Sequence, residues 1–386
     1  MAQVSVADRT GRPTAGRVAP SVGAPTRLPL VVGGLGACVP ERCVTNRDLT
    51  TAIETSDEWI MERTGIRERR VVSAGQATSD LAIAAGRAAM TDAGLTGADI
   101  DLVVLSTCTA DSPMPATSSL IARDLGISGG AFDLGAACSG WPYGLVTAAS
   151  MLTAGGGRAA LVIGAEVMSM LLDPTDRATL PLFGDGAAAA VIMGTSGPAL
   201  GTPGAQPTAT PRPAEGHGPG LLGWDLGVDG AGADLLRVPA GGSRLPATDA
   251  TLAAGDHFIK MDGREVFRRA VRCVEASCRT TLAQAGVDPS DVALFVPHQA
   301  NSRIVDAIVN RLGLVPERAM MNIDRYGNTS AASIPLALCE AAAAGRLVDG
   351  DLVLLAGFGA GMTWATVLTR WAYTGGGPAQ PSTLPA

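Results

Sequence analysis

Aromatic side chains and lysine are the scarcest features of this sequence. Aromatic residues make up 4% of it, and Lys260 is the single lysine among 29 basic residues. A core built from this chain must therefore consist mainly of aliphatic side chains, which supply most of its 47% hydrophobic content. No segment reaches the roughly 18 uninterrupted apolar residues of a transmembrane helix. The first residues also lack the apolar stretch of a secretory signal.

The charge and the cysteines exclude further classes of function. A net charge of -7 argues against nucleic acid as the main partner, so an acidic partner would need a local basic patch. The seven cysteines form no CxxC pair and no Cys/His cluster with zinc spacing. Reduced thiols in a cytosolic protein fit this pattern best, and we expect no metal and no bound prosthetic group.

Composition divides the chain into two halves and three connecting or terminal segments. Two stretches rich in Pro, Gly, Ala and Thr are expected to be a disordered N-terminal extension at 1–27 and a flexible insert at 198–219. The remaining segments are an N-terminal half at 28–197, a C-terminal half at 220–373 and a flexible tail at 374–386.

The two halves repeat each other with an offset of 192 residues, as the alignment of Gly94 with Gly286 and of Leu102 with Leu294 indicates. The pattern predicts the same order of elements in each half, listed as helix 79–93 then strand 101–107, and helix 264–285 then strand 291–296. Near-continuous apolar strands are typical of a sheet covered on both faces. We therefore predict an α/β fold in which two similar layered halves pack together.

Three polar residues each follow an apolar run: Cys138, His298 and Asn328. Each run predicts a strand, a tight turn of small residues and a helix, which places the side chain at the carboxyl edge of a sheet. We expect the site at the junction of the halves, with Cys138 from the first and the other two from the second. A thiol, an imidazole and an amide together can make, hold and break a thioester.

Each of these residues also has a simpler interpretation. A free cysteine is usually a small buried hydrophobe, but Pro142 predicts that a helix begins beside Cys138, and its dipole would favour the thiolate. His298 alone would be a structural core residue; paired with a cysteine it becomes a donor or a base. Asn328 follows a glycine, as ordinary turn residues do, so its functional interpretation depends on the other two.

Eight ordered motifs indicate the family. They are TSDEWIMERTGIRERR, FDLGAACSGW, DPTDRAT, FGDGAAAAVI, MDGREVF, VPHQANSRI, YGNTSAASIP and GFGAGMTW. Together, over about residues 29–373, they resemble the β-ketoacyl-acyl carrier protein synthase III family of the thiolase superfamily. The resemblance implies a thiolase-like αβαβα fold, acyl-CoA as a substrate rather than a cofactor, and malonyl-acyl carrier protein as the second substrate.

The resemblance also implies roles for the three residues. Cys138 would take an acyl group from coenzyme A, and His298 and Asn328 would hydrogen-bond the malonyl thioester carbonyl and stabilise the enolate left by loss of carbon dioxide. The oxyanion hole of the acyl-enzyme would be formed by the backbone N–H groups of Cys138 and Ala360, the latter in the glycine-rich turn 357–365.

Binding residues are implied one at a time. Trp59 and Arg177 match the pair that sandwiches adenine, and Arg63 matches a phosphate contact. Positions that line the pantetheine tunnel in the family correspond here to Gly263, Phe267 and Asn301.

Arg303 matches a residue that docks acyl carrier protein. Independently, Arg264, Arg268 and Arg272 recur every four residues and form one stripe on a helix, which is a solvated face by default and a docking surface for an acidic carrier by hypothesis. Met114 falls where the family places a residue at the end of the acyl pocket, and methionine there favours a branched or longer starter.

The sequence therefore predicts a decarboxylating condensation of an acyl-CoA with malonyl-acyl carrier protein, in fatty acid or polyketide biosynthesis, by a homodimer. An acyltransferase on the same scaffold, with another acceptor, is the first alternative. A non-catalytic partner subunit of a condensing complex would lack the cysteine or the histidine, and both are present. A cysteine hydrolase, a non-decarboxylating thiolase or a hydroxymethylglutaryl synthase fits the residues less well.

Overall fold

The structure is a computed structural model that describes residues 27–194, 218–378 and 380–385. The expected N-terminal extension and flexible insert therefore lie outside the described residues, apart from their edges.

Nine strands of the described chain follow one path, in the order β11-β12-β13-β8-β1-β7-β6-β4-β5. The first half contributes β1 (Leu28–Pro40), β4 (Leu102–Ser106), β5 (Gly130–Leu134), β6 (Ala159–Val167) and β7 (Asp185–Gly194). The second half contributes β8 (Gly220–Val228), β11 (Leu294–Pro297), β12 (Leu352–Gly359) and β13 (Thr363–Arg370). The two groups are joined where β1 pairs with β8, at Leu28 and Pro29.

The pairing pattern repeats between the halves. In the first, β4 and β6 are parallel, β6 and β7 antiparallel, and β7 and β1 antiparallel. In the second, β11 and β12 are parallel, β12 and β13 antiparallel, and β13 and β8 antiparallel. The four strands of the second half thus correspond in order to β4, β6, β7 and β1, as the repeated sequence predicts.

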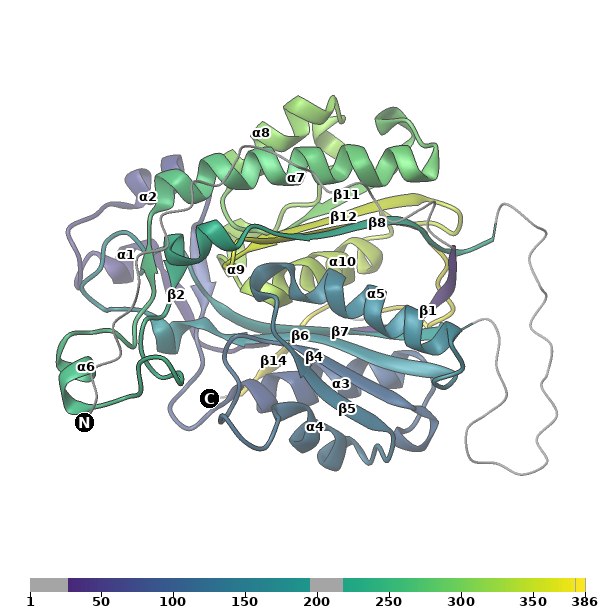
Figure 1. The fold of residues 1–386 in the computed structure, drawn as a ribbon, viewed down its shortest axis with the longest axis horizontal. Coiled ribbons are helices and arrows are strands. Elements are labelled where there is room, and N and C mark those ends of the chain that lie inside the picture. Colours follow the sequence, from purple (N-terminus) through teal and green to yellow (C-terminus); the bar gives the residue numbers. More distant parts are fainter. Residues whose placement is uncertain (1–26, 195–217, 379, 386) are drawn as a thin grey trace, which may run out of the picture.

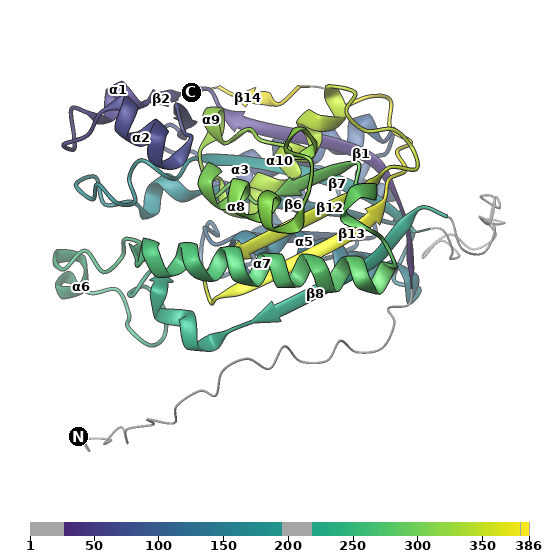
Figure 2. The same ribbon diagram turned by 90° about the horizontal axis from the view of Figure 1, so that it is seen from above.

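Helices cover the sheets in layers (Figure 1). One outer layer contains α3 (Thr78–Asp92) and α4 (Thr117–Leu125), the central layer α5 (Gly140–Thr153) and α10 (Ser333–Ala343), and the other outer layer α7 (Gly263–Ala285) and α8 (Ser302–Leu312). Figure 2 shows α7 running along the face of β8 and β13, which it contacts. The order is α, β, α, β, α, which confirms the layered fold predicted from the sequence.

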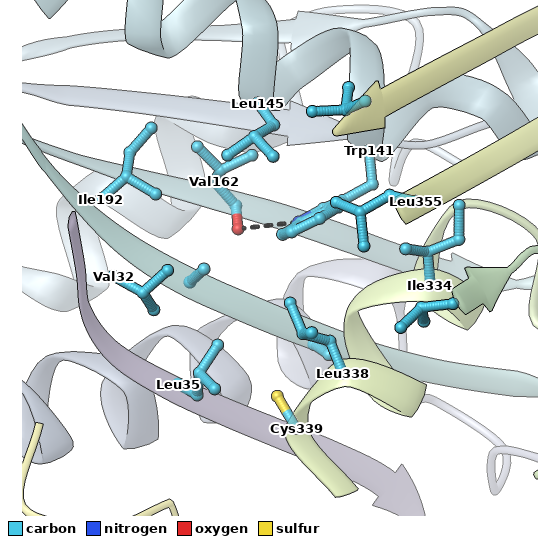
Figure 3. Packing of buried hydrophobic residues seen from close by; sticks show 14 of the residues in the cluster. Val32, Leu35, Trp141, Leu145, Val162, Ile192, Ile334, Leu338, Cys339 and Leu355 are labelled. Carbon is cyan, nitrogen blue, oxygen red and sulfur yellow. Dashed lines mark hydrogen bonds between the residues drawn. The ribbon is translucent and has the colours of Figure 1, made fainter. Parts of the chain in front are cut away.

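The central helices are apolar on nearly all sides because a sheet covers each of their faces. Trp141 of α5 is 1% exposed, and its indole N–H donates to the carbonyl of Val162 at 3.2 Å (Figure 3). Ile334 and Leu338 of α10 pack into the same cluster. On the outer side of the sheet, the close approach of α3 to β1 depends on glycine, since a Cβ on Gly36 of β1 would lie 2.3 Å from the backbone nitrogen of Ala89 in α3.

Predicted elements and observed ones differ mainly at their ends. Helix α3 and strand β4 lie within about a residue of their predicted bounds, as does α7. Strand β11 begins at Leu294, three residues later than predicted, because Pro289–Asp291 form a 3-10 turn (η5) with proline in its first position.

Shorter elements complete the fold. They are β2 (Cys43–Thr45), α1 (Asn46–Leu49), α2 (Asp57–Thr64), β3 (Glu68–Arg70), β9 (Leu236–Arg237), α6 (Asp249–Ala253), β10 (Lys260–Met261), α9 (Ile323–Tyr326) and β14 (Ser382–Leu384). Figure 1 shows α1, α2, β2 and α6 together on one side of the layers. No helix among the described residues is long and apolar enough to cross a membrane.

The tail at 374–386 differs from the expected flexible segment. Strand β14 pairs in parallel with the end of β1, and the backbone N–H of Gly377 donates to the carboxylate of Asp92 at 3.0 Å. The tail is therefore partly an added strand, and its glycines and prolines gave no sign of this backbone pairing.

Candidate active site

One cavity of about 540 Å³ brings together the three residues that the sequence singled out. Cys138 comes from the first half, and His298 and Asn328 come from the second; all three line this cavity. The site thus lies at the junction of the halves, where the sequence predicts it.

Cys138 lies in a sharp turn between β5 and α5. The turn is a 3-10 segment, Ala137–Ser139 (η2), and Ala137 has a φ of 47°, in the left-handed region. Helix α5 then begins at Gly140, with Pro142 in its first turn as predicted. Strand β12 of the other half packs against this turn: a Cβ on Gly359 would lie 2.6 Å from the backbone nitrogen of Cys138.

The protonation of Cys138 is set by two opposing effects. Cys138 lies just before the first residue of α5, where the sequence analysis expects the positive end of the helix to favour the thiolate. Burial acts against this: Cys138 is 6% exposed, and burial raises the pKa of its thiol to about 12, with the nearby carboxylate of Glu166 adding to the effect. The resting side chain is therefore a thiol, and the expected preference for thiolate is not reached.

His298 follows the last residue of β11 and is 7% exposed. Its backbone N–H donates to the carbonyl of Ala356 at 2.7 Å, and its Nδ1 lies 2.6 Å from Oγ of Ser333. Burial lowers the pKa of the imidazole to about 3, so the ring is neutral near pH 7. A neutral imidazole held in this way can donate a hydrogen bond without carrying a charge.

Asn328 is held by its backbone and by its own side chain. Its N–H donates to Leu182 at 2.8 Å, and its carbonyl accepts from Gly184 at 3.1 Å. The backbone N–H of Ser330 donates to Oδ1 of Asn328 at 2.8 Å. This bond leaves the NH₂ group as the free part of the amide, because Oδ1 is already engaged.

The cavity wall includes most of the other candidate residues of the sequence analysis. These are Trp59, Arg63, Arg177, Gly263, Arg264, Phe267, Asn301 and Arg303. Gly263 and Phe267 lie on α7, and Asn301 caps α8 by accepting from the N–H of Arg303 at 2.9 Å.

Two guanidinium groups lie over the ring of Trp59. That of Arg177 is 4.1 Å from the ring centroid, and that of Arg63 is 5.0 Å from it. The two side chains expected to sandwich adenine, Trp59 and Arg177, are therefore neighbours, and their binding of adenine stays a prediction.

The cavity wall does not include Ala360 and Met114, which the resemblance implies, or Arg268 of the arginine stripe. Arg268 is directed away and pairs with Glu265 at 2.8 Å. Ala360 directly follows Gly359, which does line the cavity. Met114 is 84% exposed, so within a single chain it does not reach the acyl pocket; the loop after β4 carries it outward to the surface.

The sequence analysis missed several buried polar residues beside the site. Glu166 of β6 is fully buried, and its carboxylate accepts from the N–H of Cys108 and from Oγ1 of Thr109, each at 2.9 Å. Burial raises the pKa of Glu166. The sequence signal for Glu166 was its position as a single acid within the apolar run of β6. Ser333 lies in a run of small residues, so the sequence had no signal that would distinguish it.

Arg69 of β3 is also missed and is 1% exposed. Its guanidinium donates to the carbonyl of Pro181 at 2.8 Å and to Oδ1 of Asn46 at 2.9 Å. Burial lowers its pKa to about 10. Arg69 thereby supports the loop 181–184, which in turn holds the backbone of Asn328.

Known proteins similar to this chain share both its sequence and its fold. A family model described as 3-oxoacyl-[acyl-carrier-protein (ACP)] synthase III matches residues 132–203, and the model of the C-terminal part of that family matches residues 282–371. The β-ketoacyl-[acyl-carrier-protein] synthase III of Symbiobacterium thermophilum is 48% identical over 344 residues, which are 89% of this chain and 98% of that protein.

Two solved structures extend the comparison. The 3-oxoacyl-(acyl carrier protein) synthase III of Pseudomonas aeruginosa is 41% identical, with a TM-score of 0.78 over 89% of this chain and 98% of that one. The priming β-ketosynthase of the R1128 polyketide biosynthetic pathway is 36% identical, with a TM-score of 0.78 over 93% of this chain and 100% of that one.

Proposed function

The chain belongs to the 3-oxoacyl-[acyl-carrier-protein] synthase III family, and from this premise we propose how its residues divide the work of the reaction. It is a thiolase-like transferase of fatty acid biosynthesis that performs a condensation. The single observation that supports the assignment of residues is that a thiol, a neutral imidazole and a primary amide surround one cavity between the halves.

The first step is acyl transfer to Cys138. The sulfur attacks the thioester carbonyl of acyl-CoA, a new S–acyl bond forms, and coenzyme A leaves as its thiolate and takes up the proton that Cys138 gave up. Because the thiol has a pKa of about 12, its proton leaves as the attack begins rather than beforehand. The backbone N–H groups of Cys138 and Ala360 are proposed to stabilise the oxyanion.

The second step makes the carbon–carbon bond. His298 and Asn328 donate hydrogen bonds to the thioester carbonyl of malonyl-acyl carrier protein. Carbon dioxide leaves, and the electron pair of the broken bond becomes an enolate that these donors stabilise. The enolate carbon attacks the acyl carbonyl on Cys138, and the sulfur departs as a thiolate that regains a proton. Donors fixed before the charge develops need no rearrangement during the reaction.

The cavity mouth is suited to anionic substrates. Arg63, Arg177, Arg264 and Arg303 line it in a chain whose net charge is -7. We assign Trp59 and Arg177 to adenine, Arg63 to phosphate, and Gly263, Phe267 and Asn301 to the pantetheine arm. Arg264 and Arg303, with the exposed Arg268, would steer the acidic carrier protein.

A homodimer is the proposed assembly. Strand β5 ends the sheet path and pairs on one side with β4, and no strand of the described residues pairs with its other edge. Met114 is exposed on the same half. If Met114 closes an acyl pocket, that pocket belongs to a second copy, which would also explain a large apolar side chain on the surface.

We also propose that the protein is cytosolic, because its cysteines fit reduced thiols.

Intact-mass analysis with a panel of acyl-CoAs, followed by malonyl-acyl carrier protein, tests the proposal. We expect one acyl adduct on wild type, none on Cys138→Ala, and then release of carbon dioxide with a β-ketoacyl carrier product. Acyl transfer to the carrier or another acceptor without carbon dioxide would instead establish a simple acyltransferase. The starters that load would separate fatty acid priming from the polyketide priming named for the R1128 relative.

A further inference from the structure

The imidazole of His298 can donate to a substrate only if its hydrogen is on the nitrogen that faces the cavity. The ring is neutral near pH 7 and so carries one hydrogen, on either Nδ1 or Nε2. With the hydrogen on Nδ1, the cavity would face a lone pair that repels a carbonyl oxygen. What Nδ1 contacts therefore decides what His298 can do.

Ser333 makes that contact. Its Oγ lies 2.6 Å from Nδ1 of His298, and the side chain is 1% exposed at the start of α10. The backbone N–H of Gln299 approaches the same oxygen at 3.4 Å. Among the described residues, these are the hydrogen-bond partners of the Ser333 hydroxyl.

The two tautomers satisfy these groups differently. If Nδ1 carried the hydrogen, it and Gln299 would both donate to Oγ, and the hydroxyl hydrogen would have no acceptor in a buried place. Leaving a buried polar hydrogen without an acceptor is unfavourable. If Ser333 instead donates to Nδ1, the hydroxyl hydrogen and the N–H of Gln299 each have an acceptor, and the ring keeps its own hydrogen on Nε2, toward the cavity.

We propose that Ser333 is a positioning residue that fixes His298 as the Nε2–H tautomer, the one that donates into the cavity. This rests on the proposed role of His298 as a donor to the malonyl thioester. The same segment also orients the second donor, because the N–H of Ser330 engages Oδ1 of Asn328 at 2.8 Å and leaves its NH₂ free. Residues 328–333 thus determine that both His298 and Asn328 have a hydrogen-bond donor left for the cavity.

The tautomer can be measured directly by nitrogen NMR on protein labelled with ¹⁵N-histidine. The chain has three histidines, so the spectrum is simple, and His298→Asn identifies the signals of His298. We expect a protonated Nε2 and an unprotonated Nδ1 in the wild type, and in Ser333→Ala a mixture or the opposite tautomer. A wild-type signal with the hydrogen on Nδ1 would overturn the proposal, whether or not any variant folds.

Kinetics provide the second measurement. Ser333→Ala should slow carbon dioxide release from malonyl-acyl carrier protein about 10–100-fold, as loss of a group that orients a histidine does. The KM should change little, and loading of Cys138 from acyl-CoA should stay within about twofold, since Ser333 does not contact the thiol. Ser333→Thr, which keeps the hydroxyl, should restore most of the rate.

Ser118→Ala is the matched control, because Ser118 is fully buried and its hydroxyl has no partner among the described residues. It should leave the rate unchanged. A wild-type rate in Ser333→Ala, or a rate in Ser333→Thr no better than in Ser333→Ala, would show that the hydroxyl does not act on His298. If wild type released no carbon dioxide, the proposed function would fail, while the NMR result would still decide the tautomer.

Discussion

The two halves build the same turn and helix, although β5 precedes the turn in the first half and α9 precedes it in the second, and only one of the turns carries a thiol. Ala137 and Ser330 both lie in the left-handed region, with φ values of 47° and 48°. Each residue begins a 3-10 segment. Ala137–Ser139 leads into α5, and Ser330–Ala332 (η7) leads into α10. Cys138 thus corresponds to Ala331, so the backbone is duplicated while the chemistry is not.

The packing around the two turns is also reciprocal. Each turn lies against a glycine in a strand of the opposite half. A Cβ on Gly357 of β12 would lie 2.8 Å from Cα of Ser139, and one on Gly164 of β6 would lie 2.4 Å from the carbonyl oxygen of Ala331. The difference between the halves therefore comes from side chains and from the cavity, which adjoins Cys138 and does not include Ala331.

The ends of the corresponding strands β11 and β4 also differ in which side chain reaches the cavity. His298 follows β11 and reaches the cavity, whereas Ser106 ends the corresponding strand β4, fully buried and with its hydroxyl unpartnered among the described residues. In the proposed reaction, the first half supplies the nucleophile and the second supplies the donors. A duplicated scaffold can assign one role to each copy because the site uses a different position from each.

Moving the nucleophile between the turns should break the function most severely. In the double variant Cys138→Ala, Ala331→Cys, we expect no acyl adduct by intact mass and a loss of turnover on the order of 10⁴-fold or more, because position 331 has no cavity beside it. Ala331→Cys alone should still load one acyl group. A second adduct, or recovery of activity in the double variant, would show that the turns are chemically equivalent.

Removing the donor at one strand end should cost less. His298→Ala should slow carbon dioxide release by about 10²–10³-fold, the usual effect of losing one donor to a developing oxyanion. The matched change in the other half, Ser106→Ala, should leave the rate within about twofold, because its hydroxyl contacts no partner. Single-turnover release of labelled carbon dioxide measures both, and equal losses would contradict the division of roles.

The pH dependence of the thiol and the imidazole sharpens the contrast between the halves. Alkylation of Cys138 by iodoacetamide should rise about tenfold per pH unit from about pH 7 to 9 without a plateau, since the thiol has a pKa of about 12. Carbon dioxide release should show no loss from protonation of His298 down to about pH 5, since its pKa is about 3.

A plateau of alkylation below about pH 9 would show that the positive end of α5 outweighs burial at Cys138. A break in carbon dioxide release near pH 6.5, absent from His298→Gln, would show that the imidazole is more exposed to solvent than its position indicates.

Relaxing the two turns should produce the smallest effect and the same one in each half. Ala137→Gly and Ser330→Gly remove the cost of a left-handed non-glycine residue, about 1–2 kcal/mol, but make the unfolded chain more flexible by about 0.4–1 kcal/mol. We expect each to raise the free energy of unfolding by about 1 kcal/mol or less, measured by urea denaturation. Changes of opposite sign would show that the turns are not strained alike.

Much of the fold follows from local patterns. Gly94 and Gly286 both end their helices with positive φ, and Leu102 and Leu294 both begin a buried strand, as the repeat predicts. Cys138 and His298 could be found because each follows a strand at a turn, as predicted. The prediction of a strand before Asn328 was wrong, because the short helix α9 precedes it, and the turn at Gly327 was the remaining signal. Glu166 interrupts an apolar run, but its role and that of Ser333 could not be assigned, because their partners lie far away in the sequence.

The sequence by itself determined the two α/β halves, the order of their elements and the three residues with the chemistry of thioester exchange, since apolar periodicity and glycine act over a few neighbouring residues. Only the tertiary structure decided the thiol form of Cys138, the neutral ring of His298, the outward position of Met114 and the ordered tail. Burial and hydrogen bonds between distant residues set these properties, and both exist only once the halves pack against each other.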